Sequence, residues 1–245
     1  MSNWKERVYA LYMSNGFADT HNMKKDFELH SRYFKKNYLK YMPKDKSKRI
    51  LDLGCGMGQF LYFCHKYGYK DCTGVDVSKE NIEFIKRKNE NAQVYNLSII
   101  DFLDDKEDYY DVIVLNDVIE HLTKEEAFDV LDAVIQAMRK DGVFLLKTPN
   151  MVNPFVSTAG RYIDITHEVG FTEISMKQML RATGFKNIVI VGTDIYVLNP
   201  LISIVTKMLS KIINLVLYIL SMLYGRTSLK IFEKDILAVA YKEKG

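Results

Sequence analysis

Residues 51–60, LDLGCGMGQF, decide the fold because they follow a short apolar run and lead into an amphipathic stretch. Gly54, Gly56 and Gly58 form the pattern G-x-G-x-G. Glycine lets the chain turn sharply there and leaves room for a bulky nucleoside against the backbone, where any Cβ would collide. A dinucleotide fingerprint, G-x-G-x-x-G, would need glycine at the position of Gln59. The spacing therefore disfavours a nicotinamide-dependent dehydrogenase.

A second motif, GVDVS at residues 74–78, closes the next strand-like run. Asp76 follows the glycine loop at close to the ~20-residue offset at which an acidic side chain meets ribose hydroxyls. Its carboxylate can accept hydrogen bonds from both hydroxyls at once. The alternative is a turn aspartate, or a cap for a helix that begins at Glu80. Together the two motifs predict a pocket for an adenosine-containing ligand.

Outward from this loop, short apolar β-type runs alternate with amphipathic stretches. Strands that alternate with helices predict an α/β fold with a parallel, doubly wound sheet. A helix is expected over 124–140, with Asp141 and Gly142 separating it from the next strand. The runs expected to form strands are 49–53, 72–78, 92–98, 111–116, 142–148, 187–196 and 235–241.

The chain of 245 residues suits one domain, 1–245, with appendages. Aromatic and basic residues at roughly helical intervals precede Pro43, so we expect an N-terminal helical cap over 1–45. The α/β core is expected over 46–196 and 235–245. The stretch 197–234 is longer than a hairpin connection needs, and we expect a helical insertion between the last two strands.

The glycine loop and Asp76 resemble the class I methyltransferases, which use S-adenosylmethionine. The resemblance covers roughly residues 49–186 and implies a Rossmann-like, seven-stranded, mostly parallel sheet. In that family the glycine loop approaches the methionine part of the cofactor, and the segment matched by VLNDVIEHL (114–122) lies beside the methyl group. Ser98 stands where the family usually has an acid near adenine, and Asp101 follows it. The cofactor-binding residues implied are Asp52, Gly54, Cys55, Gly56, Asp76, Val77, Ser98, Ile99, Asn116 and Asp117.

Glu120 and His121 follow the fourth strand and invite a catalytic interpretation, since histidine takes up protons near neutral pH. The family often carries this pair at the start of a helix. A packing and capping role is therefore the favoured prediction for both residues.

Methyl transfer from a sulfonium is an in-line displacement, so the protein must align the acceptor atom and remove the proton of a hydroxyl acceptor. The stretch 147–175 lacks regular periodicity and gathers polar side chains, and a long loop of this kind is usually functional. We predict His167 as the catalytic base or a ligand of the acceptor hydroxyl; the alternative is a histidine that ties the loop to a neighbouring helix. The expected substrate-binding residues are Asn150, Arg161, Tyr162 and Asp164.

Residues 164–175, DITHEVGFTEIS, are similar to a stretch in bacterial methyltransferases of surface polysaccharide and lipid-linked glycan pathways. This resemblance predicts O-methylation of a glycan or its precursor. A small lipid or quinone-like acceptor is the alternative, and a non-catalytic cofactor-binding scaffold is a second.

The composition excludes several other classes. The net charge of +3 is not gathered into a basic run, so no nucleic-acid partner is indicated. Cys55, Cys64 and Cys72 show no paired spacing, which favours a reducing, cytoplasmic setting, and no secretory signal opens the chain. The histidine and cysteine residues lack metal-ligand spacing, so no metal is expected.

The insertion has a strongly apolar centre, 201–225, which Lys207 and Lys211 interrupt. A spanning helix needs about 20 apolar residues, so we do not expect one. Polar residues recur at helical intervals and form a narrow stripe. A segment of this kind, 197–225, can lie in a membrane interface at the inner face of the cell membrane, form a homodimer, or cover the acceptor pocket.

Overall fold

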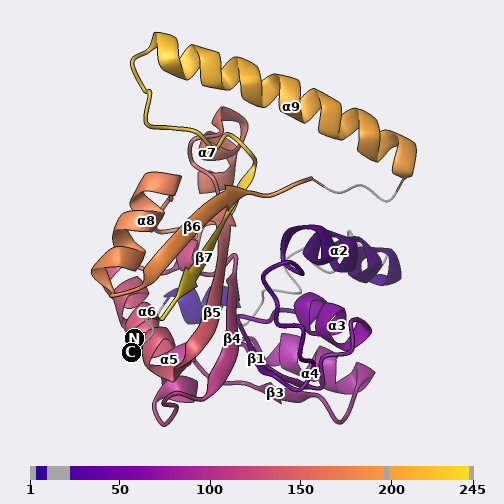
Figure 1. The fold of residues 1–245 in the computed structure, drawn as a ribbon. Helices are drawn as coiled ribbons and strands as arrows, with labels where there is room; N and C mark the ends of the chain where they lie inside the picture. The colour runs from indigo at the N-terminus through magenta and orange to yellow at the C-terminus, as the bar shows by residue number, and fades with distance from the viewer. Residues whose placement is uncertain (1–3, 10–22, 196–198, 243–245) are drawn as a thin grey trace.

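A computed structural model describes residues 4–9, 23–195 and 199–242. Seven strands form one sheet in the order β3-β2-β1-β4-β5-β7-β6 (Figure 1). Neighbouring strands are parallel except where β7 pairs with β5 and with β6. The predicted fold class, a doubly wound, Rossmann-like, mostly parallel sheet with a helix between the last two strands, is confirmed.

The elements follow the expected alternation. The strands are β1 Arg49–Leu53, β2 Asp71–Val75, β3 Gln93–Tyr95, β4 Tyr110–Asn116, β5 Met138–Pro149, β6 Lys186–Gly192 and β7 Asp235–Tyr241. The helices are α1 Trp4–Tyr9, α2 Met23–Asn37, α3 Gln59–Lys66, α4 Lys79–Lys88, α5 Ile99–Leu103, α6 Lys124–Ala137, α7 Pro154–Tyr162, α8 Glu173–Ala182 and α9 Pro200–Leu223, and a short 3-10 helix, η2, spans Ile119–His121.

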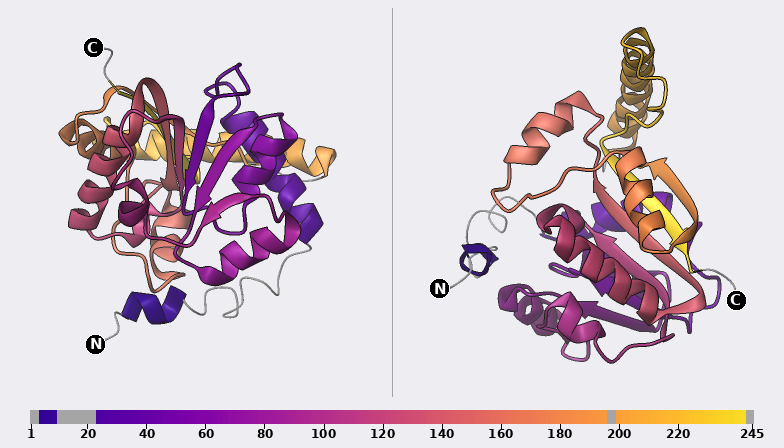
Figure 2. Two further views of the ribbon diagram at one scale, coloured as in Figure 1. Left: turned by 90° about the horizontal axis from the view of Figure 1, so that it is seen from below. Right: turned by 90° about the vertical axis from the view of Figure 1, so that its left-hand side faces the viewer.

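The sheet has a helical layer on each face (Figures 1 and 2). Leu51 and Leu53 of β1 pack in the core shared with α5, α6 and α8. Ile50 of the same strand faces the other core, where aromatic residues of α2 and α3 gather. Successive side chains of a strand point to opposite faces, so β1 alternates between the two cores and is fixed at the centre of the sheet.

The N-terminal cap is present as α2, but the helix ends at Asn37 and not at Pro43. Tyr38, directly after the helix, is fully buried, and its hydroxyl donates a 2.5 Å hydrogen bond to Oδ1 of Asn116 at the end of β4. The chain therefore leaves the helix where this aromatic side chain turns inward. Residues 1–3 and 10–22 of the expected cap lie outside the described part of the chain.

The helix expected over 124–140 ends at Ala137, because β5 already begins at Met138. Met138 is fully buried and pairs with Tyr110, after which a register irregularity carries the strand past Gly142 to the regular pairing of Val143 with Val112. Arg139 and Lys140 are exposed and favour helix locally. The burial of Met138 and the pairing of its strand with β4 override this helix propensity.

The stretch 147–175 is more regular than its sequence suggests. Asn153 caps α7 by accepting a hydrogen bond from the amide of Phe155, and Pro154 occupies the first helical turn. None of the described residues of α7 is buried. The prediction that this stretch is a loop without secondary structure was wrong.

Candidate functional site

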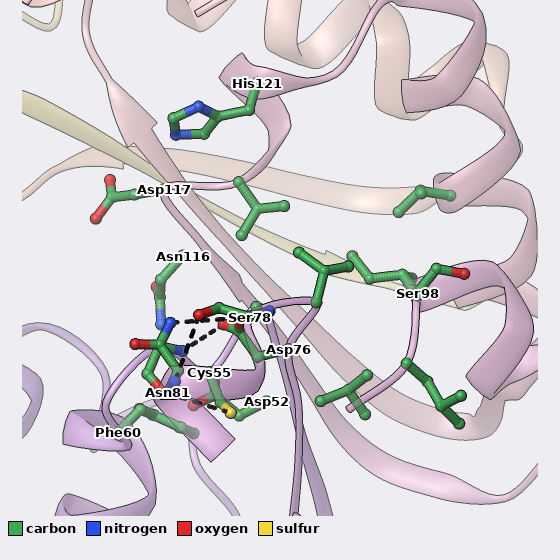
Figure 3. Close-up of a pocket in the computed structure, with 18 of the residues that line it drawn as sticks. Asp52, Cys55, Phe60, Asp76, Ser78, Asn81, Ser98, Asn116, Asp117 and His121 are labelled. Atoms are coloured by element: carbon green, nitrogen blue, oxygen red, sulfur yellow. Dashed lines mark hydrogen bonds between the residues drawn. The ribbon is translucent and has the colours of Figure 1, made fainter. Parts of the chain in front are cut away.

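A cavity of about 1080 Å³ opens at the carboxyl ends of β1, β2, β3 and β4. It lies where the strand order reverses between β1 and β4, the place where open α/β sheets bind ligands. All of the predicted cofactor-binding residues line it, and Figure 3 shows several of them around one space. They are Asp52, Gly54, Cys55, Gly56, Asp76, Val77, Ser98, Ile99, Asn116 and Asp117.

The glycine loop has the backbone that the sequence requires. Gly54 has φ +69°, and a Cβ there would lie 2.3 Å from a methyl carbon of Val118. Gly56 has φ +51° and faces more open space, where a Cβ would lie no closer than 3.9 Å to Gln59. Any larger residue at Gly54 would strain the backbone and displace Val118. Both glycines therefore keep the backbone exposed as one wall of the cavity.

Asp76 connects the end of β2 to the glycine loop. One oxygen, Oδ2, accepts from the amide of Gly56 at 2.8 Å, and Oδ1 accepts from the amide of Ser78 at 2.8 Å. Burial raises the pKa of Asp76, and these two amide hydrogen bonds oppose the rise. The carboxylate lines the cavity and supplies an acceptor for ribose hydroxyls.

Beyond Asp76, the wall that suits adenine is apolar. Val77, Leu97 and Ile100 all line the cavity and are partly exposed to it. Ser98 caps α5, because its Oγ accepts from the amide of Asp101 and donates to the carboxylate of Asp101. The carboxylate of Asp101 is thus committed to the cap and is not among the cavity's lining residues. This wall can therefore contact an adenine ring through apolar side chains, but it presents no acidic side chain to the ring.

At the opposite end, Asp52 is buried and lines the cavity. Burial, together with the negative charge of Asp76, raises the pKa of Asp52 well above its ordinary value. An ammonium group brought into the cavity would compensate this carboxylate. Lys147, which pairs with Asp117, lines the same end and offers a positive charge to a carboxylate.

The helix α2 contributes cavity residues that the sequence reasoning did not assign to the site. His30, Tyr33 and Phe34 line the cavity on the side of the cap. The available signal was the concentration of aromatic residues before Pro43, from which we predicted a helical cap and no part in the site. The cap therefore forms part of the wall of the site.

His121 lines the cavity above Asp117 (Figure 3), and its ring is held from behind. Its Nδ1 lies 2.6 Å from Oγ1 of Thr166, and that hydroxyl donates to Oδ1 of Asp164 at 2.7 Å. Partial burial acts to raise the pKa of Asp164, but hydrogen bonds from Thr166 keep this pKa below its ordinary value. The single hydroxyl proton of Thr166 is directed to this carboxylate, so Thr166 accepts from Nδ1–H of His121. The lone pair of neutral His121 is then on Nε2.

His167 does not line the cavity. Its Nδ1 lies 2.7 Å from the carbonyl oxygen of Gly160, and its ring contacts that of His121 at 4.6 Å between centroids. It thereby ties the turn after α7 to η2, which is the alternative role raised from the sequence. His167 therefore lies behind the wall of the cavity, whereas His121, whose ring it contacts, lies on that wall.

The predicted substrate-binding residues also lie outside the cavity lining. Asn150 is fully buried, and its side-chain amide donates to the carbonyls of Ile231 and Glu233. Arg161 donates to the carbonyls of His167 and Glu168. Tyr162 is 79% exposed on the outer surface. Asp164 acts on the cavity through Thr166 and His121. Asn150, Arg161 and Asp164 therefore hold the segments behind the site rather than forming its wall, and Tyr162 takes part in neither.

One group of described residues has the spacing of a cation site. Potential ligand atoms of Glu120, His121 and His167 lie within 4.8 Å of one another. Glu120 is buried and accepts a 3.0 Å hydrogen bond from Thr148, and burial with the negative charge of Asp117 raises its pKa to about 8. Glu120 is therefore largely protonated at neutral pH. The expected absence of a metal remains a prediction that chelation can test.

The donor set fits S-adenosylmethionine. The glycine backbone, the ribose acceptor Asp76, the apolar wall at Val77 and the buried acid Asp52 match its nucleoside and its amino acid part. The cavity exceeds the roughly 300–1,000 Å³ of common small-molecule sites, which leaves space for an acceptor beside the cofactor. The fold and site thus define the class: a class I, S-adenosylmethionine-dependent methyltransferase.

Comparison with known proteins agrees with this class. A family model described as a methyltransferase domain matches residues 24–190, more than half of the chain, and the chain belongs to this family. The chain is similar to a structure of a SAM-dependent methyltransferase from Archaeoglobus fulgidus, with a TM-score of 0.65 and 22% identity over 88% of this chain and 94% of that one. Human N-acetylserotonin methyltransferase in complex with SAM has a TM-score of 0.62 and 12% identity, over 97% of this chain and 56% of that one.

Curated relatives are matched over shorter regions. An uncharacterized protein of Rickettsia prowazekii is 33% identical over 107 residues, 41% of this chain and 42% of that protein. The ubiquinone biosynthesis O-methyltransferase of Bartonella quintana is 29% identical over 120 residues, 48% of this chain and 47% of that protein. The chain thus spans less than half the length of each of these two relatives.

Proposed function

We propose that this protein transfers a methyl group from S-adenosylmethionine to an oxygen atom of a glycan or glycan precursor. The observation that carries the proposal is the position of His121. It lines the cavity beside Asn116 and Asp117, and Thr166 and Asp164 direct its Nδ1–H away from the cavity wall. A hydroxyl acceptor needs a proton acceptor of this kind.

In the proposed reaction, different residues of this chain bind the cofactor and accept the proton. When bound, S-adenosylmethionine supplies a methyl group activated by a sulfonium. The glycine loop, Asp76 and Asp52 hold the cofactor and fix the direction from which an acceptor can approach. Nε2 of His121 takes the proton of the acceptor hydroxyl, and Asp164 stabilises the resulting imidazolium through Thr166. His121 is largely buried and meets the acceptor side only where it lines the cavity.

The choice of a glycan is supported by residues 164–175, the stretch that is similar to one in surface-glycan methyltransferases. Asp164 and Thr166 from this stretch orient His121, and Thr172 forms a capping box with Ser175 that begins α8. The resemblance therefore falls on residues that build the base. A sugar hydroxyl, which is a weak acid, would gain from a base oriented in this way.

A quinone-like phenol is the second candidate acceptor. It is supported by the similarity to the ubiquinone biosynthesis O-methyltransferase of Bartonella quintana. A phenol loses its proton more readily than a sugar hydroxyl, so its methylation should depend less on His121. Comparing wild type and His121→Gln on both acceptor classes separates the two candidates.

The first experiment is calorimetric titration with S-adenosylmethionine and S-adenosylhomocysteine, with NAD as a control. Saturable binding of the first two alone supports the assigned cofactor, whereas preference for NAD contradicts it. Transfer of radiolabelled methyl groups to a panel of nucleotide sugars, lipid-linked sugars and quinone precursors then tests the acceptor. Cofactor binding without transfer to any acceptor would favour the non-catalytic scaffold.

We also propose a cytoplasmic location, without a nucleic-acid partner. Cys55, Cys64 and Cys72 are free thiols, as expected in a reducing compartment. Labelling of Cys72, the least buried of the three, in intact and lysed cells with a membrane-impermeant thiol reagent tests the location, since a cytoplasmic thiol reacts only after lysis.

A further inference from the structure

On the surface of a soluble protein, the apolar face of an amphipathic helix packs against the core and its polar face meets water. In α9 the two faces are exchanged. Its side chains that are shielded from solvent are almost all polar. In the described part of α9 only Ser203 is buried, and the partly buried residues are Thr206, Lys207, Ser210, Asn214, Leu217 and Ser221. Their spacing places them on one face, and this face is turned toward the body of the protein.

The outward surface of α9 is apolar and wide. Leu209 is 54% exposed, Ile212 56% and Leu223 77%, and isoleucine, leucine, valine and methionine continue along the helix. Within Leu201–Leu223, a stretch of 18 residues has a mean hydropathy of 1.6 and only 6% of it is buried, so by length and composition the helix could also cross a membrane. In water such a surface would be strongly unfavourable. The environment that suits it is hydrocarbon.

The sheet excludes a spanning arrangement for this helix. It leaves from the end of β6 and returns to the start of β7, and these ends are adjacent, because Thr193 donates from its amide to the carbonyl of Asp235. A helix of this length extends about 36 Å, so a span would require Tyr224–Lys234, with its charged residues, to return through the bilayer. Figure 1 shows α9 lying across the end of the sheet instead.

The charge of this region indicates which kind of surface α9 binds. The sequence has no acidic residue between Asp194 and Glu233, while Lys211, Arg226 and Lys230 fall within that interval and are exposed; Lys207 lies there too, partly buried on the face toward the protein. Exposed lysine and arginine at a membrane surface are attracted to anionic lipid headgroups. In a second copy of the chain the same basic residues would repel each other. A dimer would also bury only a stripe of each helix and leave its flanks in water.

We propose that α9 lies in the interface of an anionic lipid bilayer, with its apolar surface among the acyl chains and its polar face against the protein. The helix lies at the carboxyl edge of the sheet, the edge at which the cofactor cavity opens. Membrane binding therefore holds the cavity close to the headgroups. This inference goes beyond the proposed reaction and does not depend on which acceptor is used.

Vesicle flotation with the full chain tests the proposal. Protein bound to vesicles rises with them in a density gradient, whereas free or aggregated protein does not. The probe is vesicles of equimolar phosphatidylglycerol and phosphatidylcholine, compared with phosphatidylcholine alone. We expect flotation with the anionic vesicles and much weaker flotation with the neutral ones. The double variant Leu209→Gln, Val216→Gln should lower the partition coefficient by about tenfold or more, as expected for removing two buried aliphatic side chains.

A matched variant, Phe128→Gln with Val189→Gln, changes two exposed apolar residues of α6 and β6, outside α9, and should float like wild type. Lys211→Gln with Arg226→Gln should reduce the preference for anionic vesicles.

Calorimetric binding of S-adenosylhomocysteine by every variant verifies folding separately from membrane binding. Equal flotation of the Leu209, Val216 variant and wild type overturns the proposal. So does a stable dimer in sedimentation analysis that does not float with either vesicle.

Discussion

Nδ1 of His121 lies 2.6 Å from the hydroxyl of Thr166, whose proton is directed to Asp164. This relationship joins η2, after β4, to the turn after α7. It holds Nδ1 of the ring and fixes the orientation of the imidazole. In the proposed reaction the base depends on Thr166 and Asp164, so substitution of either residue should be measurable in the rate of transfer.

His121→Gln should slow methyl transfer by about 10²–10⁴-fold, the usual contribution of a positioned base, and leave cofactor affinity nearly unchanged. Thr166→Val should cause a smaller loss and alter the pH profile of kcat, since the ring loses its orienting partner. Rates with saturating cofactor, measured across pH, give both results. A His121→Gln enzyme as fast as wild type would show that alignment alone suffices.

Asp76→Ala should weaken cofactor binding by about 10–100-fold, because a charged hydrogen-bond acceptor contributes roughly 1.5–3 kcal/mol. The variant also loses the bond from the amide of Gly56, so the glycine loop is less well held. Calorimetry with S-adenosylhomocysteine measures the change. Asp101→Ala is the control, because its carboxylate belongs to the α5 cap; an equal loss in both variants would remove Asp76 from the ribose site.

Gly54→Ala should destabilise the fold by about 1–3 kcal/mol from backbone strain alone, with an added penalty from the contact with Val118. Val118→Ala removes the contacting methyl carbon but leaves φ positive. The double variant should therefore recover part of the lost stability and not all of it. Denaturant unfolding of the four proteins in the cycle measures this, and full recovery would mean that the backbone carries no strain.

Glu120→Gln should reduce the pH dependence of stability. The folded pKa of Glu120, about 8, is raised above its ordinary value of 4.5 mainly by burial, with the charge of Asp117 adding to it. A raised folded pKa contributes stability that is complete below the unfolded pKa and is lost as pH rises toward the folded one. Wild type should lose up to about 1.4 kcal/mol for each pH unit in this window, relative to the variant. Parallel stability curves would contradict the assignment.

Treatment with EDTA should leave methyl transfer unchanged, since the proposed transfer uses no metal and Glu120, which forms a cluster with His121 and His167, already accepts a hydrogen bond from Thr148. The measurement compares rates before and after chelation and after adding back Mg²⁺, Mn²⁺ or Zn²⁺. A loss restored by one of these ions would make the three residues a metal site and replace the role of His121 as a base.

The sequence predicted the parts of the molecule that depend on local pattern. The strand over 49–53, the glycine loop and Asp76 lie where expected, because positive φ and burial on both faces of the sheet constrain the residue types directly. Asn150 was predicted to bind the substrate and His167 to act as the base or bind the acceptor hydroxyl, but the partners of their side chains are the carbonyls of Ile231 and Gly160. Such side-chain to backbone bonds to other elements leave no periodic signal.

The start of β5 and the role of α2 escaped prediction for related reasons. Met138 is held by pairing with Tyr110 on another strand, and His30 faces a cavity whose other walls come from 52 to 147 in the sequence. Both depend on tertiary neighbours. The α9 helix was recognisable as apolar, but the direction of its polar face required the structure.

The position of β7 has a consequence for how the chain is made. This strand lies between β5 and β6 in the sheet but follows α9 in the sequence. During translation, α9 therefore leaves the ribosome while β5 still has an unpaired edge, and the sheet closes only afterwards. An unfinished edge next to an uncovered apolar helix favours aggregation. Early capture of α9 by the membrane would protect the nascent chain until its last gap is filled.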